Sequence, residues 1–382
     1  MKKLSLIISV ISVVIFFYHP SGVRAERSDI LPREQVISNN TTYKHVQLAQ
    51  AKAAQTPSAA YRAAAGFVKE VYPQTWGAKG DGKTDDTQAV QNAINAIAKA
   101  GGGDVVFVKG TYLVNNVVLD SNVNIVGQGW DSILLQKSGA TYGVSVNPGN
   151  GGTPNPADNK HDITIRNIQL KGTVEKDGFA EHFHLLNLNA VTKVTIKACK
   201  FAGWRGDAIY IGSGNIAQTE RHNRSVTISG CSFDGLNNNN RNAVSIIDGD
   251  NIVIDKNSFA HCTRSDMPGA IDVEPDFKFN IIKDIRISRN KFIKIGGQVN
   301  IAINIVPRVG KLDRRLEHIA IIDNTILSEN NIGIYVNQDQ FDPNETPSSN
   351  DISISGNTIK NTKRPIVIHG FKYVNTKNNI LE

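Results

Sequence analysis

From residue 163 to the C-terminus, two aliphatic residues separated by one position recur along the chain. The pairs begin at Ile163, Val194, Val226, Ile252, Ile285, Ile319, Ile352 and Val374, with spacings from 22 residues (352 to 374) to 34 residues (285 to 319). Side chains at positions i and i+2 lie on the same face of a β-strand, so each pair predicts a short strand with one buried face. One strand cannot bury that face alone, so the copies are expected to stack.

Each copy continues into two further columns, one polar and one apolar. The first column reads Ile168, Cys199, Cys231, Asn257, Asn290, Asn324, Asn357 and Asn379. The second column, two residues further on, reads Leu170, Phe201, Phe233, Phe259, Phe292, Ile326, Ile359 and Leu381. Asparagine tolerates left-handed backbone angles and bonds its own turn, so the first column predicts an amide ladder at a coil corner. The second column is expected to fill the interior.

A second aliphatic pair follows in each copy and completes the prediction of the fold. These pairs are Ile209/Ile211, Val244/Ile246, Ile271/Val273, Ile303/Ile305, Ile334/Val336 and Ile366/Ile368. We therefore expect an all-β protein, a right-handed parallel β-helix, formed by residues 66–382. Such a solenoid extends its core along one axis, so it escapes the usual single-core limit of about 250 to 300 residues.

The N-terminus has the pattern of a signal peptide over residues 1–25. Met1, Lys2 and Lys3 supply positive charge, residues 4–18 form an apolar run, and residues 23–25 are a plausible cleavage site. A membrane anchor is the alternative, but the run is shorter than the roughly 20 residues that span a bilayer. We expect export to a bacterial periplasm or medium, with no stable membrane span after cleavage. Residues 26–65 lack periodicity and are predicted to be a flexible linker.

The three cysteines leave at least one thiol unpaired. Cys199 and Cys231 share a column in adjacent coils, roughly 4.8 Å apart, so a disulfide and two packed thiols both remain open. Their place in an interior column favours thiols, and Cys262 stands apart. No His/Cys spacing matches a structural zinc site.

An amphipathic helix is predicted after the segment GlyAlaLysGlyAspGlyLysThrAspAsp, residues 77–86. Residues 84–86 offer capping side chains, and the three glycines at 101–103 end the helix. One apolar face, formed by Ala89, Val90, Ala93, Ile94, Ile97 and Ala98, can cap the open end of the stack. With the following ValValPheValLysGlyThrTyr, this opening resembles that of the pectate-lyase-like β-helix superfamily, which includes polygalacturonases, rhamnogalacturonases, tailspikes, lyases and epimerases. The resemblance implies the fold over residues 68–382 and suggests a polysaccharide substrate.

The residues that face outward on the second strand are the candidates for function. Asp272 and Glu274 lie two residues apart on one strand, so their backbone origins are about 6.5 to 7 Å apart, which suits an inverting acid and base. An ordinary solvated strand face is the alternative. Polar and aromatic side chains along this face suit sugar rings and hydroxyls. The predicted substrate-binding residues on it are Asn187, Tyr210, Ser245, Asn304 and Tyr335.

Further acidic and basic residues are predicted near this face. Asp207 begins the strand of a neighbouring coil, and Asp248 either joins the acidic group or forms a tight turn. Arg241, in a pattern similar to one in poorly described members of the superfamily, is a fourth candidate catalytic residue. The net charge of +7 and the arginines Arg205, Arg221, Arg224, Arg241, Arg264 and Arg308 favour an acidic glycan. Surplus charge serving only solubility is the alternative, and nucleic acid is not expected.

Three functions remain open at this point. Hydrolysis would use Asp272 and Glu274 as acid and base, and these two are the most clearly indicated candidate residues. A lyase or C5-epimerase would abstract a C5 proton with Arg241 or a nearby Lys or His, with calcium as a conceivable cofactor, and it explains the charge better. A noncatalytic glycan-binding protein would not need both carboxyls. The chain lacks the GlyHisGly of polygalacturonases, so that activity is not expected.

Overall fold

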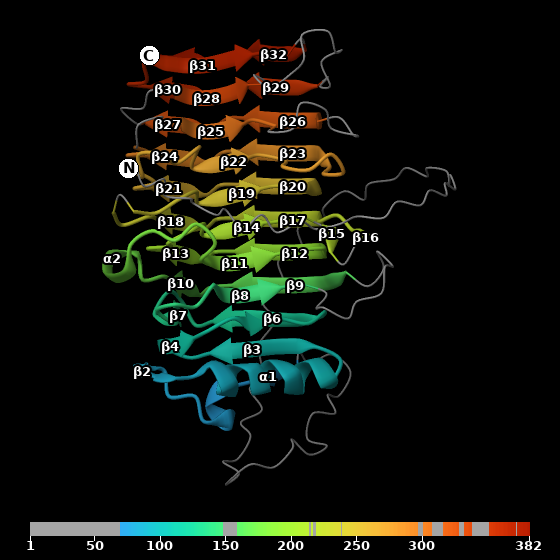
Figure 1. Cartoon of the computed structure of the whole chain (residues 1–382), viewed down its shortest axis with the longest axis vertical. Helices are drawn as coiled ribbons and strands as arrows, with labels where there is room; N and C mark the ends of the chain where they lie inside the picture. Colours follow the sequence, from blue (N-terminus) through green and yellow to red (C-terminus); the bar gives the residue numbers. More distant parts are fainter. Residues whose placement is uncertain are drawn as a thin grey trace, which may run out of the picture. The chain divides into compact units, whose positions relative to one another are not determined.

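The computed structural model describes residues 69–147, 159–213, 215–216, 219–237, 239–296, 301–307, 316–327, 332–337, 351–371 and 373–382. The predicted signal peptide (1–25), the predicted linker (26–65) and Arg308 lie outside the described residues. Successive coils stack one above another, with helix α1 (Thr87–Lys99) at the N-terminal end of the stack (Figure 1). No helix in the described part of the chain is long and apolar enough to cross a membrane.

Three parallel sheets run along the stack, as a right-handed parallel β-helix requires. The first sheet contains the strands that the first aliphatic pairs predict. Its members in order are β1 (Glu70–Val71), β3 (Gly103–Phe107), β6 (Val123–Gly127), β9 (Lys160–Arg166), β12 (Val191–Lys197), β17 (Arg224–Ser229), β20 (Gly249–Asp255), β23 (Ile282–Ser288), β26 (Leu316–Ile322), β29 (Ile352–Ser355) and β32 (Val374–Lys377). The register aligns Val194, Val226, Ile252 and Ile285 in one inward column.

The second sheet is built from the apolar column that was expected only to fill the interior. Its strands are β2 (Asp81–Asp85), β4 (Gly110–Val114), β7 (Ser132–Gln136), β10 (Gln169–Lys171), β13 (Lys200–Ala202), β18 (Ser232–Asp234), β21 (Ser258–Ala260), β24 (Lys291–Ile293), β27 (Thr325–Leu327), β30 (Thr358–Lys360) and β33 (Ile380–Leu381). From β10 onward, most of these strands have three residues and point one apolar side chain inward, so the alternation that marks a strand is too short to recognise in the sequence.

The third sheet carries the candidate functional residues. Its strands, in order from the C-terminal end, are β31 (Arg364–His369), β28 (Ile332–Asn337), β25 (Ile301–Ile305), β22 (Ile271–Val273), β19 (Val244–Ile246), β14 (Ile209–Ile211), β11 (His184–Leu188), β8 (Tyr142–Val146) and β5 (Val117–Val118). Outside the three sheets are a 3-10 helix (Pro73–Trp76), helix α2 (Val174–Asp177) and the antiparallel pair β15 (Asn215–Ile216) and β16 (Thr219–Glu220).

The predicted amide ladder is present at the corner between the first and second sheets. Asn257 Nδ2 donates to Asn290 Oδ1 at 3.0 Å, and Asn290 Nδ2 donates to Asn324 Oδ1 at 3.0 Å. Asn324 and Asn357 continue the same pattern as far as Asn379. Each Nδ2 also reaches a backbone carbonyl of a neighbouring coil, so the ladder ties successive coils together.

Aromatic side chains stack in the interior beside this ladder. The rings of Phe201, Phe233, Phe259 and Phe292 follow one another at centroid distances of 4.9, 4.7 and 4.8 Å and are nearly parallel. Stacked coils place equivalent side chains about 4.8 Å apart, which lies within the range of centroid distances that aromatic pairs prefer. The three cysteines are free and buried, as the interior position of Cys199 and Cys231 predicted.

Helix α1 covers the N-terminal end of the core, as predicted, through Val90, Ala93, Ile94 and Ile97. The residue that caps it, Asp85, lies within the predicted range 84–86. Asp85 Oδ1 accepts the backbone N–H of Thr87, whereas Asp86 accepts the N–H groups of Lys79 and Gly80 and makes no cap bond. The repeat also begins earlier than residue 163, because β1, β3 and β6 belong to the first sheet. Irregular spacing hides these early coils in the sequence.

Candidate active site

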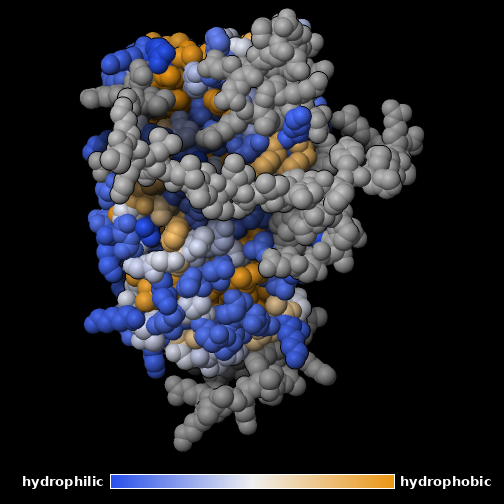
Figure 2. Space-filling view, in the orientation of Figure 1, coloured by the Kyte–Doolittle hydropathy of each residue, from blue (hydrophilic) through white to orange (hydrophobic). Residues whose placement is uncertain are grey.

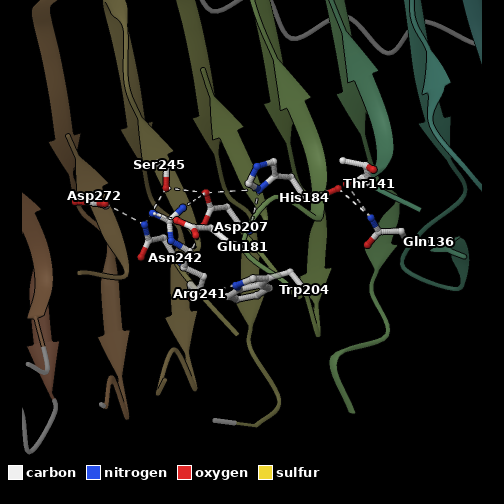
Figure 3. Close-up of polar contacts among 10 residues, drawn as sticks. All are labelled: Gln136, Thr141, Glu181, His184, Trp204, Asp207, Arg241, Asn242, Ser245 and Asp272. Carbon is white, nitrogen blue, oxygen red and sulfur yellow. Dashed lines mark hydrogen bonds and ion pairs between the residues drawn. The ribbon is translucent and has the colours of Figure 1, made fainter. Parts of the chain in front are cut away.

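The predicted outward column on the third sheet is present and in register. Tyr210 pairs with Ser245, Ser245 with Asp272, Asp272 with Asn304, and Asn304 with Tyr335. Asn187 precedes them opposite Tyr210. The alternative of an ordinary solvated strand face is wrong for most of this column, because Asn187, Ser245, Asp272 and Asn304 are at most 4% exposed. Many of these polar side chains are instead joined by hydrogen bonds along neighbouring strands (Figure 3).

Asp272 lies between two amides from neighbouring coils. Asn304 Nδ2 donates to its Oδ1 at 2.7 Å, and Asn242 Nδ2 donates to its Oδ2 at 3.0 Å. Burial raises the pKa of Asp272 well above its usual range, and the charge of Glu274, two residues away, raises the pKa further. The bond from Asn304 and the charge of Arg241 oppose this rise without cancelling it. Asp272 is therefore suited to hold a proton at a pH where an ordinary aspartate has lost it.

Asp207 forms a second buried carboxyl group in the same network. Ser245 Oγ donates to Asp207 Oδ2 at 3.0 Å, and the backbone N–H of Asn242 donates to Oδ1 at 3.3 Å. Arg241 Nη1 contacts Asp207 Oδ2 at 3.3 Å. Asn242 Nδ2 also donates to Ser245 Oγ at 2.9 Å, so Asn242 links the Asp207 group to Asp272. One hydrogen-bonded network thus spans the coils of Asp207, Ser245, Asp272 and Asn304.

Arg241 places a positive charge beside these carboxyls. Its side chain is 15% exposed, and it contacts Asp207 and, at 3.6 Å, Glu181, whose side chain is 52% exposed. Burial works against the charge of Arg241, but Asp207 and the other carboxylates outweigh it, so its pKa is raised. Trp204 Nε1 donates to the Arg241 carbonyl at 3.3 Å and fixes the backbone here. Arg241 is thus a permanent cation that contacts one buried aspartate and one exposed glutamate.

His184 lies at the N-terminal side of Asp207 and was not predicted. Its ring stacks on Tyr210 at a centroid distance of 4.6 Å and on Tyr142 at 6.0 Å. The backbone N–H of Asp207 donates to His184 Nδ1 at 3.0 Å, so this nitrogen is an acceptor and the ring proton is on Nε2. Burial, with the nearby charge of Arg241, lowers the pKa of His184 to about 3. His184 is therefore a neutral hydrogen-bond donor and not a base.

The buried Asp207 predicts a pH dependence of stability. Burial raises its pKa from 3.8 to about 6, although Arg241 and the Ser245 hydroxyl oppose the shift. Between these values the folded protein binds a proton that the unfolded chain has lost, so the stabilisation is complete below pH 3.8 and is lost as the pH rises through 6. This pKa difference corresponds to about 3 kcal/mol. Asp207→Asn cannot titrate, so its free energy of unfolding should gain about 3 kcal/mol relative to wild type between pH 4 and 7.

Urea unfolding at several pH values measures this difference. Asp255→Asn is the matched control, because the bonds from Arg289 and Ser288 lower the pKa of Asp255 and its contribution changes with pH in the opposite direction. A difference between Asp207→Asn and wild type that stays constant with pH would show that Asp207 keeps an ordinary pKa.

Two of the other predicted site residues lie apart from the network. Arg205 donates to the carbonyls of Gly178 and Asp177 at 2.8 and 3.1 Å, so it holds the end of α2. Asp248 lies at the corner after β19, where it accepts from His222 Nδ1 at 2.8 Å. The tight turn over residues 248–251 that was the alternative for Asp248 is reduced to a bend, because Gly249 already begins β20, and no described bond joins Asp248 to Asp272. Tyr335 lies in the predicted column, two coils beyond Asp272.

Sequence reasoning missed Asn242 and Glu181 as well as His184. Asn242 was visible as the residue two before Val244, but strand alternation does not show that its side chain turns toward Asp272. Among the described residues, no group of three or more His, Cys, Asp or Glu side chains is arranged to hold a metal ion.

In the space-filling view, hydrophilic residues predominate over the coloured part of the lower half, and apolar residues form scattered patches (Figure 2).

Residues 73–292 match the family described as rhamnogalacturonase A/epimerase, pectate lyase-like. This match covers more than half of the chain and includes Asp207, Arg241, Asp272 and Glu274. The chain therefore belongs to that family, which confirms the resemblance stated from the opening motif.

Shorter similarities connect the chain to proteins of several activities. It is 46% identical over 69 residues to alginate lyase 7 of Azotobacter vinelandii, which is 16% of this chain and 8% of the relative. It is 57% identical over 44 residues to plasmin and fibronectin-binding protein A of Streptococcus pneumoniae (strain ATCC BAA-255 / R6), or 11% and 6% of the two chains. The chain thus matches less than one tenth of either relative.

A solved structure with a similar fold is the A-module of the Azotobacter vinelandii mannuronan C-5 epimerase AlgE4. The two chains are 17% identical, with a TM-score of 0.44, and the match covers 81% of this chain and 95% of the module. These proteins differ in activity, so the reaction of this chain has to be argued from its own residues.

Proposed function

We propose that this protein is an enzyme that hydrolyses glycosidic bonds of an anionic polysaccharide, with Asp272 as proton donor and Glu274 as the base. The observation that carries the proposal is the raised pKa of Asp272, which burial and the charge of Glu274 cause. A general acid must hold its proton at the working pH, and its neighbour must be ionised to act as a base. Both side chains are nearly buried, at 1% and 6% exposure, and low exposure strengthens electrostatic interactions.

In the proposed hydrolysis, Asp272 gives up a proton and Glu274 takes one. The Asp272 proton moves to the glycosidic oxygen while the bond from that oxygen to the anomeric carbon breaks and its electron pair stays on the oxygen. A water molecule bonds to the anomeric carbon and gives its proton to Glu274. Solvent then returns a proton to Asp272 and removes one from Glu274. Three further side chains act as positioning residues in this step. The Asn242 amide donates to Asp272 and to Ser245, and the Ser245 hydroxyl donates to Asp207, which fixes the position of both.

Arg241 supports the choice of an anionic substrate. Its contact with Glu181 is at 3.6 Å, and Glu181 is exposed, so a carboxylate on a sugar can replace Glu181 at the same guanidinium. Tyr210, stacked on His184, offers an aromatic face beside this cation. The pattern of residues 1–25 supports export to the periplasm or medium, where such polymers are found.

Two other functions have specific support. The similarity to alginate lyase 7 favours β-elimination, or the related C5-epimerisation, on a uronate-containing glycan, in which Arg241 would neutralise the sugar carboxylate. His184, a neutral donor at Nε2, would not be the base of that reaction. The similarity to plasmin and fibronectin-binding protein A favours a noncatalytic binding protein.

Incubation of the mature protein with acidic and neutral polysaccharides tests these alternatives. We expect new reducing ends without the ultraviolet absorbance of unsaturated uronates, and a loss of about 10²- to 10⁴-fold in Glu274→Gln. Glu317→Gln is the matched control, because the Glu317 side chain is 44% exposed and pairs with Lys283 at 3.7 Å on another sheet, the first. New ultraviolet absorbance would establish a lyase instead. Binding without either product, unchanged in the Asp272→Asn/Glu274→Gln double variant, would establish a noncatalytic protein.

A further inference from the structure

Arg221 is a buried cation that the network around Asp272 does not use. It lies between β16 and β17, is 1% exposed, and is among the largest fully buried side chains of the protein. Its Nε and Nη1 atoms are buried and have no hydrogen-bond partner in the described part of the chain. A guanidinium is charged at every physiological pH, so this side chain cannot escape the cost of burial by losing its proton.

Two carboxylates contact the three residues that follow Arg221 in the chain, and both are engaged by other groups. Asp248 accepts from His222 Nδ1 at 2.8 Å and from the backbone N–H groups of Asn223 and Ile281 at 3.2 and 2.8 Å. Asp250, two residues further on, pairs with Arg224 at 3.7 Å. Neither Asp248 nor Asp250 bonds to Arg221 in the described part of the chain, so these two carboxylates do not balance its charge.

We propose that Arg221 is the anchor of an anion-binding site that takes a carboxylate or sulfate group. A buried charge without a partner is destabilising, and an oxyanion removes this cost by accepting from the guanidinium nitrogens. A water molecule can accept the same hydrogen bonds, but it leaves the charge uncompensated. The positive net charge of +7 increases the local concentration of anions around the whole protein.

The surrounding corner holds the backbone of Arg221 in place. Asn223, two residues on, donates from Nδ2 to the carbonyls of Gly212 and Asp248 at 2.8 and 3.0 Å. Gly212 directly follows β14, the strand that carries Tyr210. A hydrogen bond from Asn223 to Gly212 therefore links the corner of Arg221 to the end of β14, a strand of the candidate active site. The anion site itself requires only that an anion binds, and no catalysis. It goes beyond the proposed hydrolysis, and it can hold where that proposal fails.

Thermal unfolding of the full mature protein with added anions tests the site. Sodium sulfate and sodium chloride represent free inorganic anions, and sodium glucuronate represents the carboxylate of a glycan. In wild type we expect a Tm that rises with anion concentration and saturates, because the ligand binds only the folded state. Arg221→Met should lack the saturable rise and, without anion, should have a Tm at or above that of wild type, because the unpaired charge is gone.

Arg224→Met is the matched control, since Arg224 is 53% exposed and has a partner in Asp250. Comparing variants at equal salt removes the general effect of salt on stability. A saturable response to sulfate or chloride alone identifies an inorganic anion as the ligand, and a response to glucuronate identifies a glycan carboxylate. The proposal is overturned if wild type shows no saturable response, or if Arg221→Met responds as wild type does. Should Arg221→Met fail to fold, calorimetric titration of wild type with the same anions decides, and absence of binding refutes the site.

Discussion

Asn290→Ala is expected to lower the free energy of unfolding by about 4 kcal/mol, at roughly 1 kcal/mol for each of four lost hydrogen bonds. Asn290 Oδ1 accepts from the backbone N–H and from Nδ2 of Asn257, and its Nδ2 donates to Ile254 O and to Asn324 Oδ1. Asn290 is 1% exposed, so water cannot replace these bonds when the amide is removed. The loss falls on both neighbouring coils, which in a solenoid supply most of each other's stability.

Urea unfolding measures this effect as a lower midpoint with an unchanged slope. Asn379→Ala is the matched control at the end of the ladder. Asn379 accepts the same two bonds from Asn357 and donates to Ile354 O, but it is only partly buried, so water can take its place. We expect a cost of about 1 kcal/mol or less there. Equal costs at both positions would show that the ladder adds nothing to the stability of the inner coils.

Asp272→Asn is expected to lower kcat by about 10²- to 10⁴-fold on a polysaccharide substrate, because the proton donor to the leaving oxygen is lost. The substitution keeps the shape of the side chain, and burial raises the pKa of Asp272 and so favours its neutral form, which an amide resembles, so folding should change little. Asp284→Asn is the matched control, since Asp284 is exposed and contacts His318 at 2.9 Å. Its left-handed backbone angle also suits asparagine.

The leaving group separates the two proposed roles. A substrate with an acidic phenol as leaving group needs no proton donor, so Asp272→Asn should recover most of its activity on it. Glu274→Gln should remain slow on the same substrate, because attack by water still needs a base. Equal loss of both variants on both substrates, with a parallel loss of Tm, would mean that Asp272 is a structural residue only.

Much of the fold could be read from the sequence because each coil repeats the same local requirements. Asn257, Asn290, Asn324 and Asn357 occupy one position of the repeat, and a stacked amide has its partner in the next copy. The third sheet was predicted in register for the same reason, from its aliphatic pairs. The short strands of the second sheet were missed because three residues carry too little alternation. Asp85 rather than Asp86 caps α1, a choice that depends on the turn at Lys79 and Gly80.

The candidate site was predicted in part. Asp207, Arg241, Ser245, Asp272 and Asn304 were named from their strand positions, and the structure joins them in one network. Their burial was not predicted, because alternation distinguishes the two faces of a strand and says nothing of what covers the outer face. Asn242 was missed because it lies before β19, where alternation no longer applies. His184 was missed because it begins β11, whose aliphatic pair was not recognised in the sequence.

The sequence by itself determined the stack: which residues face inward, which amides meet, and which carboxyls share a face. These follow from side-chain alternation and a repeated coil length, both local properties. Only the tertiary structure decided the protonation states, because the pKa values of Asp207, Asp272 and His184 depend on burial and on charges from other coils. The same holds for Arg221, whose unpaired charge becomes visible only when the groups around it are placed in space.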